Sequence, residues 1–288
     1  MSNIMLHPCI IENGINTCYI DSLLVALFYQ QSAIDDILNH DPKDACMIYL
    51  QELIKSRFVE KMRHRVSIGT DDINMIRNYA VQNGWCNDSC DIYEQQDVSE
   101  FYNFLLNGFS ANYLEFEKIK MNNSDGTNNG LIEKLPFIPL HPSIEEGTTS
   151  VRELLIKWIN NTLTETNNTE QQYCYCLKTI PSYLPLCINR FTNQGERIHT
   201  QVDIMKRIKL FEISDKMQSN IKWKIHSIIC NASITPKSGH YYTVLLVNDM
   251  WILFDDTQVP SFKQVDINDR QFADRIMREC VMIFYILE

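Results

Sequence analysis

Helix-forming and strand-forming patterns occupy separate parts of this chain, and this separation constrains the fold most. In four segments before about residue 110, apolar residues recur at one-turn spacing, which predicts helices. From Tyr173 onward the pattern favours strands, with a short helix before the last of them. Helices first and strands second predict an α+β architecture.

The expected elements follow from this patterning. The expected helices are residues 18–31, 44–63, 71–84, 97–108, 150–159 and 268–277. Asp71 or Asp72 is expected to cap the third helix, and Gly84 to end it. Residues 122–130 predict a loop, and residues 162–172 a polar, exposed segment. The expected strands are residues 131–140, 183–191, 202–211, 223–232, 241–247, 251–254 and 280–287.

The composition suits a sizeable folded core and disfavours two kinds of partner. Of 288 residues, 45% are hydrophobic, which is enough for one large domain. A net charge of −10 predicts no nonspecific binding to nucleic acid. No stretch approaches the ~20 apolar residues of a membrane span, and residues 1–8 do not resemble a signal peptide. Ten cysteines in no dense framework are typical of reduced intracellular thiols, so we expect a cytoplasmic location, with the nucleus as the alternative. We also expect a monomer.

A nucleophile is predicted at Cys18. The preceding residues include Gly14 and several polar side chains, which suit a turn, and no Gly or Pro interrupts residues 18–31. Cys18 is therefore expected at or near a helix N-terminus, where the partial positive charge favours the reactive thiolate. The amide of Asn13, on the preceding loop, can point at an oxygen bound beside the sulfur. The alternative for Cys18 is a buried structural thiol.

A general base is predicted at His240. It opens a strand-like run, and residues 251–254 can return as the next strand after a turn near residues 248–249. Residues near the outer ends of such a hairpin are cross-strand neighbours, so Asp255 or Asp256 can reach His240. This would supply a base and its orienting group. The alternatives are a core histidine and two turn aspartates.

Four short motifs follow one another along nearly the whole chain. They are Asn-x-x-Asn-Thr-Cys-Tyr-x-x-Ser at 13–22, Gln-Gln-Asp at 95–97, a strand ending in Arg-Phe at 184–191, and Ser-Gly-His-Tyr with Trp-x-x-Phe-Asp-Asp at 238–256. In this order they resemble the motifs of the ubiquitin-specific protease family of cysteine deubiquitinases. Two residues depart from that resemblance, because Ile15 and Asp21 stand where the family usually has Gly and Asn.

The resemblance implies a papain-like cysteine protease hand architecture in one catalytic domain, residues 1–288. Within it, a helical thumb lobe would pack against an antiparallel β palm, with reduced fingers between them in the sequence. The implied regions are 1–110 for the thumb, 111–177 for the fingers and a helix, and 178–288 for the palm. The substrate would lie in the cleft between thumb and palm.

The resemblance also implies roles for the site residues. The nucleophile, the base and the residue that orients the base would be Cys18, His240 and Asp255. Asp256 is the rival of Asp255 and would help it on the oxyanion side, where Asn13 would be the donor. For Asn13 the alternative is an Asx turn or a cap.

Further residues resemble those that contact the C-terminal tail of ubiquitin. Asp97 and Glu100 match acidic residues that contact this basic tail. The alternative is that Asp97 caps a helix and that Glu100 is a solvated side chain. Tyr241 resembles the aromatic residue that walls the tail channel, and Gly239 gives room for a backbone to pass. The alternatives for these two are ordinary strand packing and a turn glycine.

Zinc is not expected, and neither is another cofactor. The family often carries two Cys-x-x-Cys pairs in its fingers, whereas this chain has Cys174 and Cys176 alone there and no cysteine in residues 111–131. Cys86 and Cys90 lie before the Gln-Gln-Asp segment, in the wrong place. Since a structural zinc ion needs four ligands, the fingers should be short or reshaped.

The leading functional hypothesis is a thiol-dependent deubiquitinase. It would hydrolyse the (iso)peptide bond after the C-terminal glycine of ubiquitin, with ubiquitin or ubiquitinated proteins as partners. The alternatives are a protease for another ubiquitin-like modifier, a ubiquitin-binding pseudoenzyme and an unrelated Cys-His-Asp acyltransferase. The complete set of triad residue types disfavours the pseudoenzyme, and the two middle motifs disfavour the acyltransferase.

Overall fold

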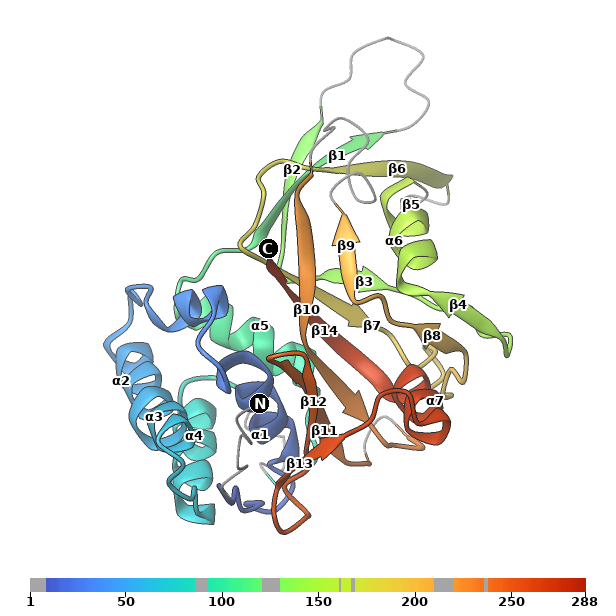
Figure 1. The fold of residues 1–288 in the computed structure, drawn as a ribbon. Coiled ribbons are helices and arrows are strands. Elements are labelled where there is room, and N and C mark those ends of the chain that lie inside the picture. Colours follow the sequence, from blue (N-terminus) through green and yellow to red (C-terminus); the bar gives the residue numbers. More distant parts are fainter. Residues whose placement is uncertain are drawn as a thin grey trace.

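A helical lobe packs beside a large β-sheet, and a smaller sheet extends from the far end of the large one (Figure 1). The computed structural model describes residues 9–85, 93–120, 130–160, 162–166, 169–209, 220–235 and 238–288. The first helices of the chain form the helical lobe, and most of the later chain forms the sheets. The α+β class expected from the sequence is confirmed.

The helical lobe follows the predicted order of helices. The expected helix at residues 44–63 is present as three helical segments in direct succession, and Asp44 caps it by accepting a hydrogen bond from the backbone N–H of Cys46 at 2.9 Å. The described helices are α1 (Cys18–Phe28), the 3-10 helix η1 (Ala33–Leu38), α2 (Ala45–Leu53), the π-helix η2 (Ile54–Val59), α3 (Glu60–Arg63), α4 (Thr70–Gln82), α5 (Val98–Gly108), α6 (Val151–Asn160) and α7 (Arg270–Glu279).

The predicted cap of α4 is wrong. The helix begins at Thr70 with Gly69 as its N-cap residue, so Asp71 and Asp72 lie inside the first turn. Asp72 accepts a hydrogen bond from the backbone N–H of Gly69 at 3.3 Å, as the third residue of a capping box does. Gly84, just beyond the end of the helix, has a φ of 87°, which suits a glycine that ends a helix.

The strands of the described chain form three sheets. The large sheet has the order β13-β12-β11-β10-β14-β7-β3, with β9 paired to β10; the small one has the order β2-β1-β6-β5, and β4 pairs with β8. The strands are β1 (Leu114–Lys120), β2 (Leu131–Leu135), β3 (Ile138–Leu140), β4 (Thr148–Ser150), β5 (Thr162–Thr166), β6 (Thr169–Leu177), β7 (Tyr183–Ile188), β8 (Gln201–Asp203), β9 (Arg207–Lys209), β10 (Lys222–Asn231), β11 (Tyr241–Val247), β12 (Met250–Phe254), β13 (Phe262–Val265) and β14 (Cys280–Leu287).

Several boundaries predicted from the sequence are wrong. Residues 131–140 form two strands in different sheets. Pro136 lies between them and has no N–H to donate to a ladder. The described part of residues 202–211 likewise includes residues of two strands, β8 and β9. In the polar segment, residues 162–166 and 169–172 belong to the antiparallel pair β5–β6. Its threonines favour strands although the segment is not apolar. Most of the expected loop at 122–130 lies outside the described residues.

Helix α1 is the part of the core that joins the two lobes. Every one of its residues is buried, and it packs against β11 and β10 of the large sheet as well as against α5. Thr243 on β11 donates to the backbone carbonyl of Ser22 at 2.8 Å, and Ser227 on β10 donates to that of Ala26 at 2.8 Å. Each such buried bond contributes about 1 kcal/mol net. The N-terminus of α1 is therefore fixed next to the start of β11.

Candidate active site

A strained turn presents Cys18 as the first residue of α1. Ile15 and Asn16 have φ values of 68° and 53°, in the left-handed region, and Thr17 follows at the N-cap position without a capping bond from its side chain. The hydroxyl of Thr17 accepts a hydrogen bond from the backbone N–H of Gly14 at 2.7 Å, which closes the turn. The turn brings Cys18 to the end of the helix, where the unpaired N–H groups favour negative charge on a sulfur.

A buried arginine of α4 holds this turn from the inside. Arg77 is only 1% exposed, and its Nη1 donates to the backbone carbonyl of Ile15 at 2.7 Å. Its Nη2 donates to the side chain of Asn74 at 2.7 Å. Arg77 is not among the site residues predicted from the sequence, although a basic residue on an otherwise apolar helix face is a signal that could identify it.

The β11–β12 hairpin brings His240 to Asp255. Asn248 and Asp249 form its two-residue turn with φ values of 49° and 61°, and Thr243 pairs with Phe254. His240 directly precedes β11 and Asp255 directly follows β12, so the two side chains meet across the ladder. The distance from Nε2 of His240 to Oδ1 of Asp255 is 2.9 Å.

Asp255 is held in its charged form by a set of donors. Its Oδ1 accepts from the backbone N–H and the hydroxyl of Thr257, at 3.0 and 2.6 Å, and its Oδ2 accepts from Nε2 of Gln258 at 2.7 Å. Burial alone would raise the pKa of Asp255, but the bonds to His240 and Thr257 outweigh it and hold the pKa well below its usual range. A fixed carboxylate therefore orients the imidazole.

The surroundings of His240 favour the imidazolium. Burial by itself lowers the pKa of His240, but hydrogen bonds to Asp255 and Cys18, together with the charges of Cys18 and Asp256, raise it to about 10. Because Nε2 faces Asp255, Nδ1 is the ring nitrogen left for the sulfur of Cys18. A cationic imidazole beside a sulfur is the arrangement that favours a thiolate.

Asp256 points to the loop before Cys18. Its Oδ2 accepts a hydrogen bond from Nδ2 of Asn13 at 2.6 Å, and its Oδ1 lies 3.6 Å from Nε2 of His240. A carboxylate cannot itself donate to an oxyanion, so Asp256 can act on that side only through Asn13. One amide hydrogen of Asn13 is engaged by Asp256, and the other is left to donate elsewhere.

Of the four residues expected at the substrate tail, Asp97 and Tyr241 meet at a cleft between the two lobes, and Glu100 and Gly239 do not line it. A cavity of about 270 Å³ lies between α5 and the large sheet, and Asp97 and Tyr241 both line it, together with His141, Cys187 and Phe191. Asp97 also caps α5, because its Oδ1 accepts from the backbone N–H groups of Ser99 and Glu100 at 2.7 and 3.2 Å. Glu100 is exposed one turn farther along the helix.

The atoms around residue 239 leave room only for a glycine. It has a φ of 146°, and a Cβ at this position would lie 2.2 Å from Cβ of Ser233 and 2.7 Å from its Cα. No side chain fits in that space. The close approach of the chain at Ser233 therefore accounts for this glycine without a substrate.

The two cysteines considered for zinc lie on one strand. Cys174 and Cys176 are on β6, opposite Ile119 and Glu117 of β1, so that neighbouring strand brings them no further thiol. Among the described residues neither forms a disulfide, and Cys86 and Cys90 lie outside those residues. The absence of zinc stays a prediction.

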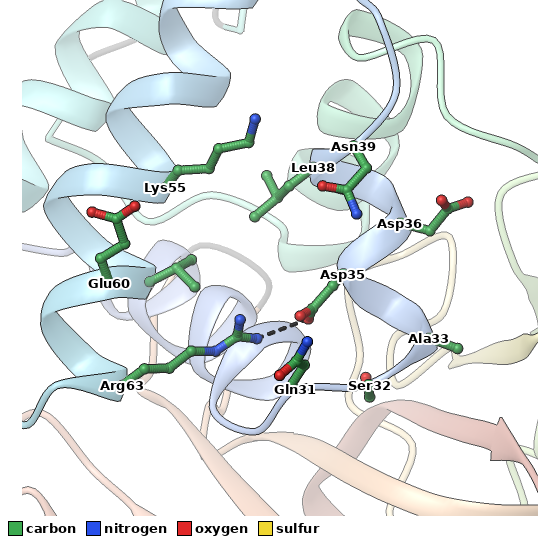
Figure 2. A pocket seen from close by; sticks show the side chains of 11 residues that line it. Gln31, Ser32, Ala33, Asp35, Asp36, Leu38, Asn39, Lys55, Glu60 and Arg63 are labelled. Atoms are coloured by element: carbon green, nitrogen blue, oxygen red, sulfur yellow. Dashed lines mark hydrogen bonds and ion pairs between the residues drawn. The ribbon is translucent and has the colours of Figure 1, made fainter.

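A second hollow lies within the helical lobe, apart from Cys18 and His240. Its volume is about 460 Å³, and its lining residues come from η1 and from the helices η2 and α3 that face it (Figure 2). Arg63 donates to Oδ1 of Asp35 across it at 2.8 Å and to the backbone carbonyl of Phe28 at 2.9 Å. This arginine thus connects parts of the lobe, and the residues lining the hollow include neither a cysteine nor a histidine. In the described part of the chain, no helix has the length and apolar character needed to cross a membrane.

Comparisons with known proteins agree with this site. Residues 9–285 match the family model described as ubiquitin carboxyl-terminal hydrolase. Ubiquitin carboxyl-terminal hydrolase 46 of Caenorhabditis elegans is 22% identical over 333 residues (84% of this chain, 76% of that protein). Ubiquitin carboxyl-terminal hydrolase 12 of Salmo salar is 23% identical over 303 residues (84% and 78%).

Solved structures share the fold. The yeast SAGA DUBm structure has a TM-score of 0.71 at 12% identity, over 100% of this chain and 71% of that one. The SAGA Ubp8/Sgf11/Sus1/Sgf73 DUB module bound to ubiquitin aldehyde has a TM-score of 0.70 at 14% identity, over 100% and 72%. The family model spans nearly all of the chain and includes Cys18, His240 and Asp255. The chain therefore belongs to the ubiquitin carboxyl-terminal hydrolase family and is a cysteine-type deubiquitinase.

Proposed function

We propose that Cys18, His240 and Asp255 form the catalytic triad that hydrolyses the bond after the C-terminal glycine of ubiquitin. The observation that carries this assignment is the continuous contact from Asp255 through His240 to Cys18, at the N-terminus of a buried helix. The sulfur is partnered by the imidazole of His240, at the N-terminus of the helix that packs against both α5 and the large sheet. These are the conditions for a thiolate nucleophile.

The reaction follows from these positions. The thiolate of Cys18 attacks the carbonyl carbon of the terminal glycine, and the carbonyl oxygen becomes an oxyanion that the free amide hydrogen of Asn13 stabilises. The imidazolium of His240 gives its proton to the leaving amine, and a thioester remains on Cys18. His240 then takes a proton from water, which attacks the thioester and releases the carboxylate. Asp255 holds the imidazole in position through both steps.

The cleft lined by Asp97 and Tyr241 is proposed to receive the tail of ubiquitin. The cleft lies between the start of α5 and Tyr241 at the start of β11, the residue next to His240, so a chain lying in it would be directed towards His240. Asp97 and Glu100 place negative charge at one rim, where a basic tail would be attracted. Ubiquitin is favoured over other modifiers because one of the solved structures that share this fold is bound to ubiquitin aldehyde.

An electrophilic probe built on the ubiquitin C-terminus tests the assignment. The wild-type enzyme should be labelled on Cys18, and Cys18→Ala should abolish both labelling and cleavage of a ubiquitin C-terminal fluorogenic substrate while the fold is retained. Cys46→Ala is the matched control, because Cys46 is exposed and free on α2. Binding of ubiquitin without labelling would identify a pseudoenzyme. Faster labelling by a probe built on another ubiquitin-like modifier would change the substrate assignment.

A further inference from the structure

Two buried carboxyl groups meet beside the catalytic histidine. Asp21, in the first turn of α1, is 0% exposed, and the side chain of Asp256 is also 0% exposed. The two side chains are in hydrogen-bonding contact. Among the described residues, neither Oδ1 of Asp21 nor Oδ1 of Asp256 receives an N–H or O–H donor. Such buried, unsatisfied oxygens are rare and require an explanation.

The other oxygen of each carboxyl group is already engaged. Oδ2 of Asp21 accepts from the hydroxyl of Thr17 at 2.9 Å, and Oδ2 of Asp256 accepts from the amide of Asn13 at 2.6 Å. The two Oδ1 atoms are therefore left for each other. Two ionised carboxylates in contact would repel strongly away from water, whereas one shared proton turns the repulsion into a hydrogen bond.

The surrounding charges decide which carboxyl group holds the proton. Asp256 faces the imidazolium of His240 at 3.6 Å and the amide of Asn13, and both favour its ionised form. Burial opposes this and raises the pKa of Asp256, and the charge of Asp255, which faces the same ring nitrogen of His240, adds to that effect. Asp21 faces the neutral hydroxyl of Thr17 and the sulfur of Cys18, and a negative sulfur disfavours a second negative charge. The neutral acid is therefore Asp21.

We propose that Asp21 is a positioning residue that stays protonated and donates a hydrogen bond from its Oδ1 to Oδ1 of Asp256. Asp256, fixed in this way, holds the amide of Asn13 at the oxyanion side of Cys18. The catalytic part of this inference rests on the proposed function; the location of the proton does not. A protonated aspartate with one donor and one acceptor has the hydrogen-bonding pattern of an asparagine, the residue type usual at this position in the family that the sequence resembles.

The proton is tested by the pH dependence of thermal stability. The pKa of Asp21 in the folded chain lies well above its ordinary value, because of burial and the charge of Asp256. The wild-type protein therefore loses stability as pH rises from the unfolded-state pKa towards the folded-state pKa. Asp21→Asn removes this loss, so its Tm advantage over wild type should widen between pH 5 and pH 8. A difference in Tm that is constant with pH, or an Asp21→Asn chain that does not fold, would overturn the proposal.

Infrared spectroscopy gives a second measurement that needs no activity. The wild-type enzyme at pH 8 should show the C=O stretch of a protonated carboxyl group, and this band should be missing from Asp21→Asn. A wild-type spectrum without the band would show that both carboxyl groups are ionised.

Activity tests the positioning role with a matched pair of variants. Asp21→Asn keeps the donor and should keep kcat within about threefold of wild type, whereas Asp21→Leu has the same size without the donor and should lower kcat about tenfold at unchanged KM. Equal kcat values for both variants would overturn the positioning role. If the stability and infrared results hold but the wild-type enzyme cleaves no ubiquitin substrate, the proposed function fails and the proton assignment stands.

Discussion

Asn13 and Asp256 are separated by 243 positions in the chain, yet their side chains are joined by a hydrogen bond of 2.6 Å. The bond connects the loop before the nucleophile to the end of the hairpin that carries the base. It engages one amide hydrogen of Asn13 with Asp256 and leaves the second amide hydrogen for an oxyanion beside Cys18. Asp256, just after β12 of the large sheet, thus holds Asn13, the residue expected to donate to the oxyanion.

Asn13→Ala is expected to lower kcat roughly 100- to 1000-fold, the usual loss for one oxyanion donor, with little effect on KM. The reason is that the donor acts on charge that develops only in the transition state. Steady-state kinetics with a ubiquitin C-terminal fluorogenic substrate measure both constants. A raised KM at constant kcat would make Asn13 a binding residue instead.

Asp255→Asn and Asp256→Asn should differ in kind. Asp255 contacts His240 directly at 2.9 Å, so its loss should disturb the imidazolium and lower kcat. The loss should be smaller than the roughly 10⁴-fold seen in a serine protease, because Cys18 and Asp256 also raise the pKa of His240. Asp256→Asn should act more weakly and resemble Asn13→Ala, because Asp256 acts through the Asn13 amide. If Asp256→Asn is the more damaging change and Asp255→Asn is nearly silent, the triad must be reassigned.

The stability of the enzyme should fall in alkaline solution because of His240. Its pKa is raised from 6.5 to about 10 in the folded chain, chiefly by Asp255 and Cys18 against the effect of burial. This stabilisation is fully present below the unfolded value of 6.5 and is lost as pH rises through 10. His240→Gln lacks the titrating group, so the Tm of wild type relative to this variant should decline between pH 6.5 and pH 10. A difference that does not change with pH would contradict an imidazolium in the resting enzyme.

Two substitutions at Asp97 separate its role as the N-cap residue of α5 from the effect of its negative charge on the substrate. Asp97→Asn keeps an N-cap residue, whereas Asp97→Ala removes the bonds to Ser99 and Glu100 and should cost α5 about 1 kcal/mol. If Asp97 attracts a basic tail, Asp97→Asn should raise KM, and more so at low salt because ions screen the attraction. Adding Glu100→Gln should increase the effect. An Asp97→Asn enzyme with wild-type KM at low salt would leave helix capping as its only role.

Ile15→Gly should stabilise the chain. A β-branched residue at a φ of 68° is strained by about 1–2 kcal/mol, and glycine relieves this while adding about 0.5–1 kcal/mol of backbone entropy to the unfolded chain. The side chain is 65% exposed, so little packing is lost. Denaturant unfolding should therefore show a gain of about 0.5–1 kcal/mol. Asn16→Gly is the control and should gain less, because asparagine tolerates the left-handed region.

The sequence by itself determined the local features of the site. Helix periodicity located Cys18 at the first residue of α1, the two-residue turn at 248–249 fixed the hairpin, and Asp97 was placed at the start of α5. These features depend on hydrogen bonds and side-chain alternation within a few residues, so a short stretch of sequence contains the information. The expected thumb, fingers and palm boundaries, the monomeric state and the cytoplasmic location stay predictions.

Only the tertiary structure decided how these local elements meet. The hairpin alone left Asp255 and Asp256 as rivals, and the packing of α1 against β11 directs the first to His240 and the second to Asn13. The same packing buries Asp21 against Asp256, and α4 brings Arg77 to the turn before Cys18. These contacts join residues far apart in the sequence, and their geometry depends on how the side chains of two lobes fill one core. No local pattern carries that information, because it is a property of the packed core as a whole.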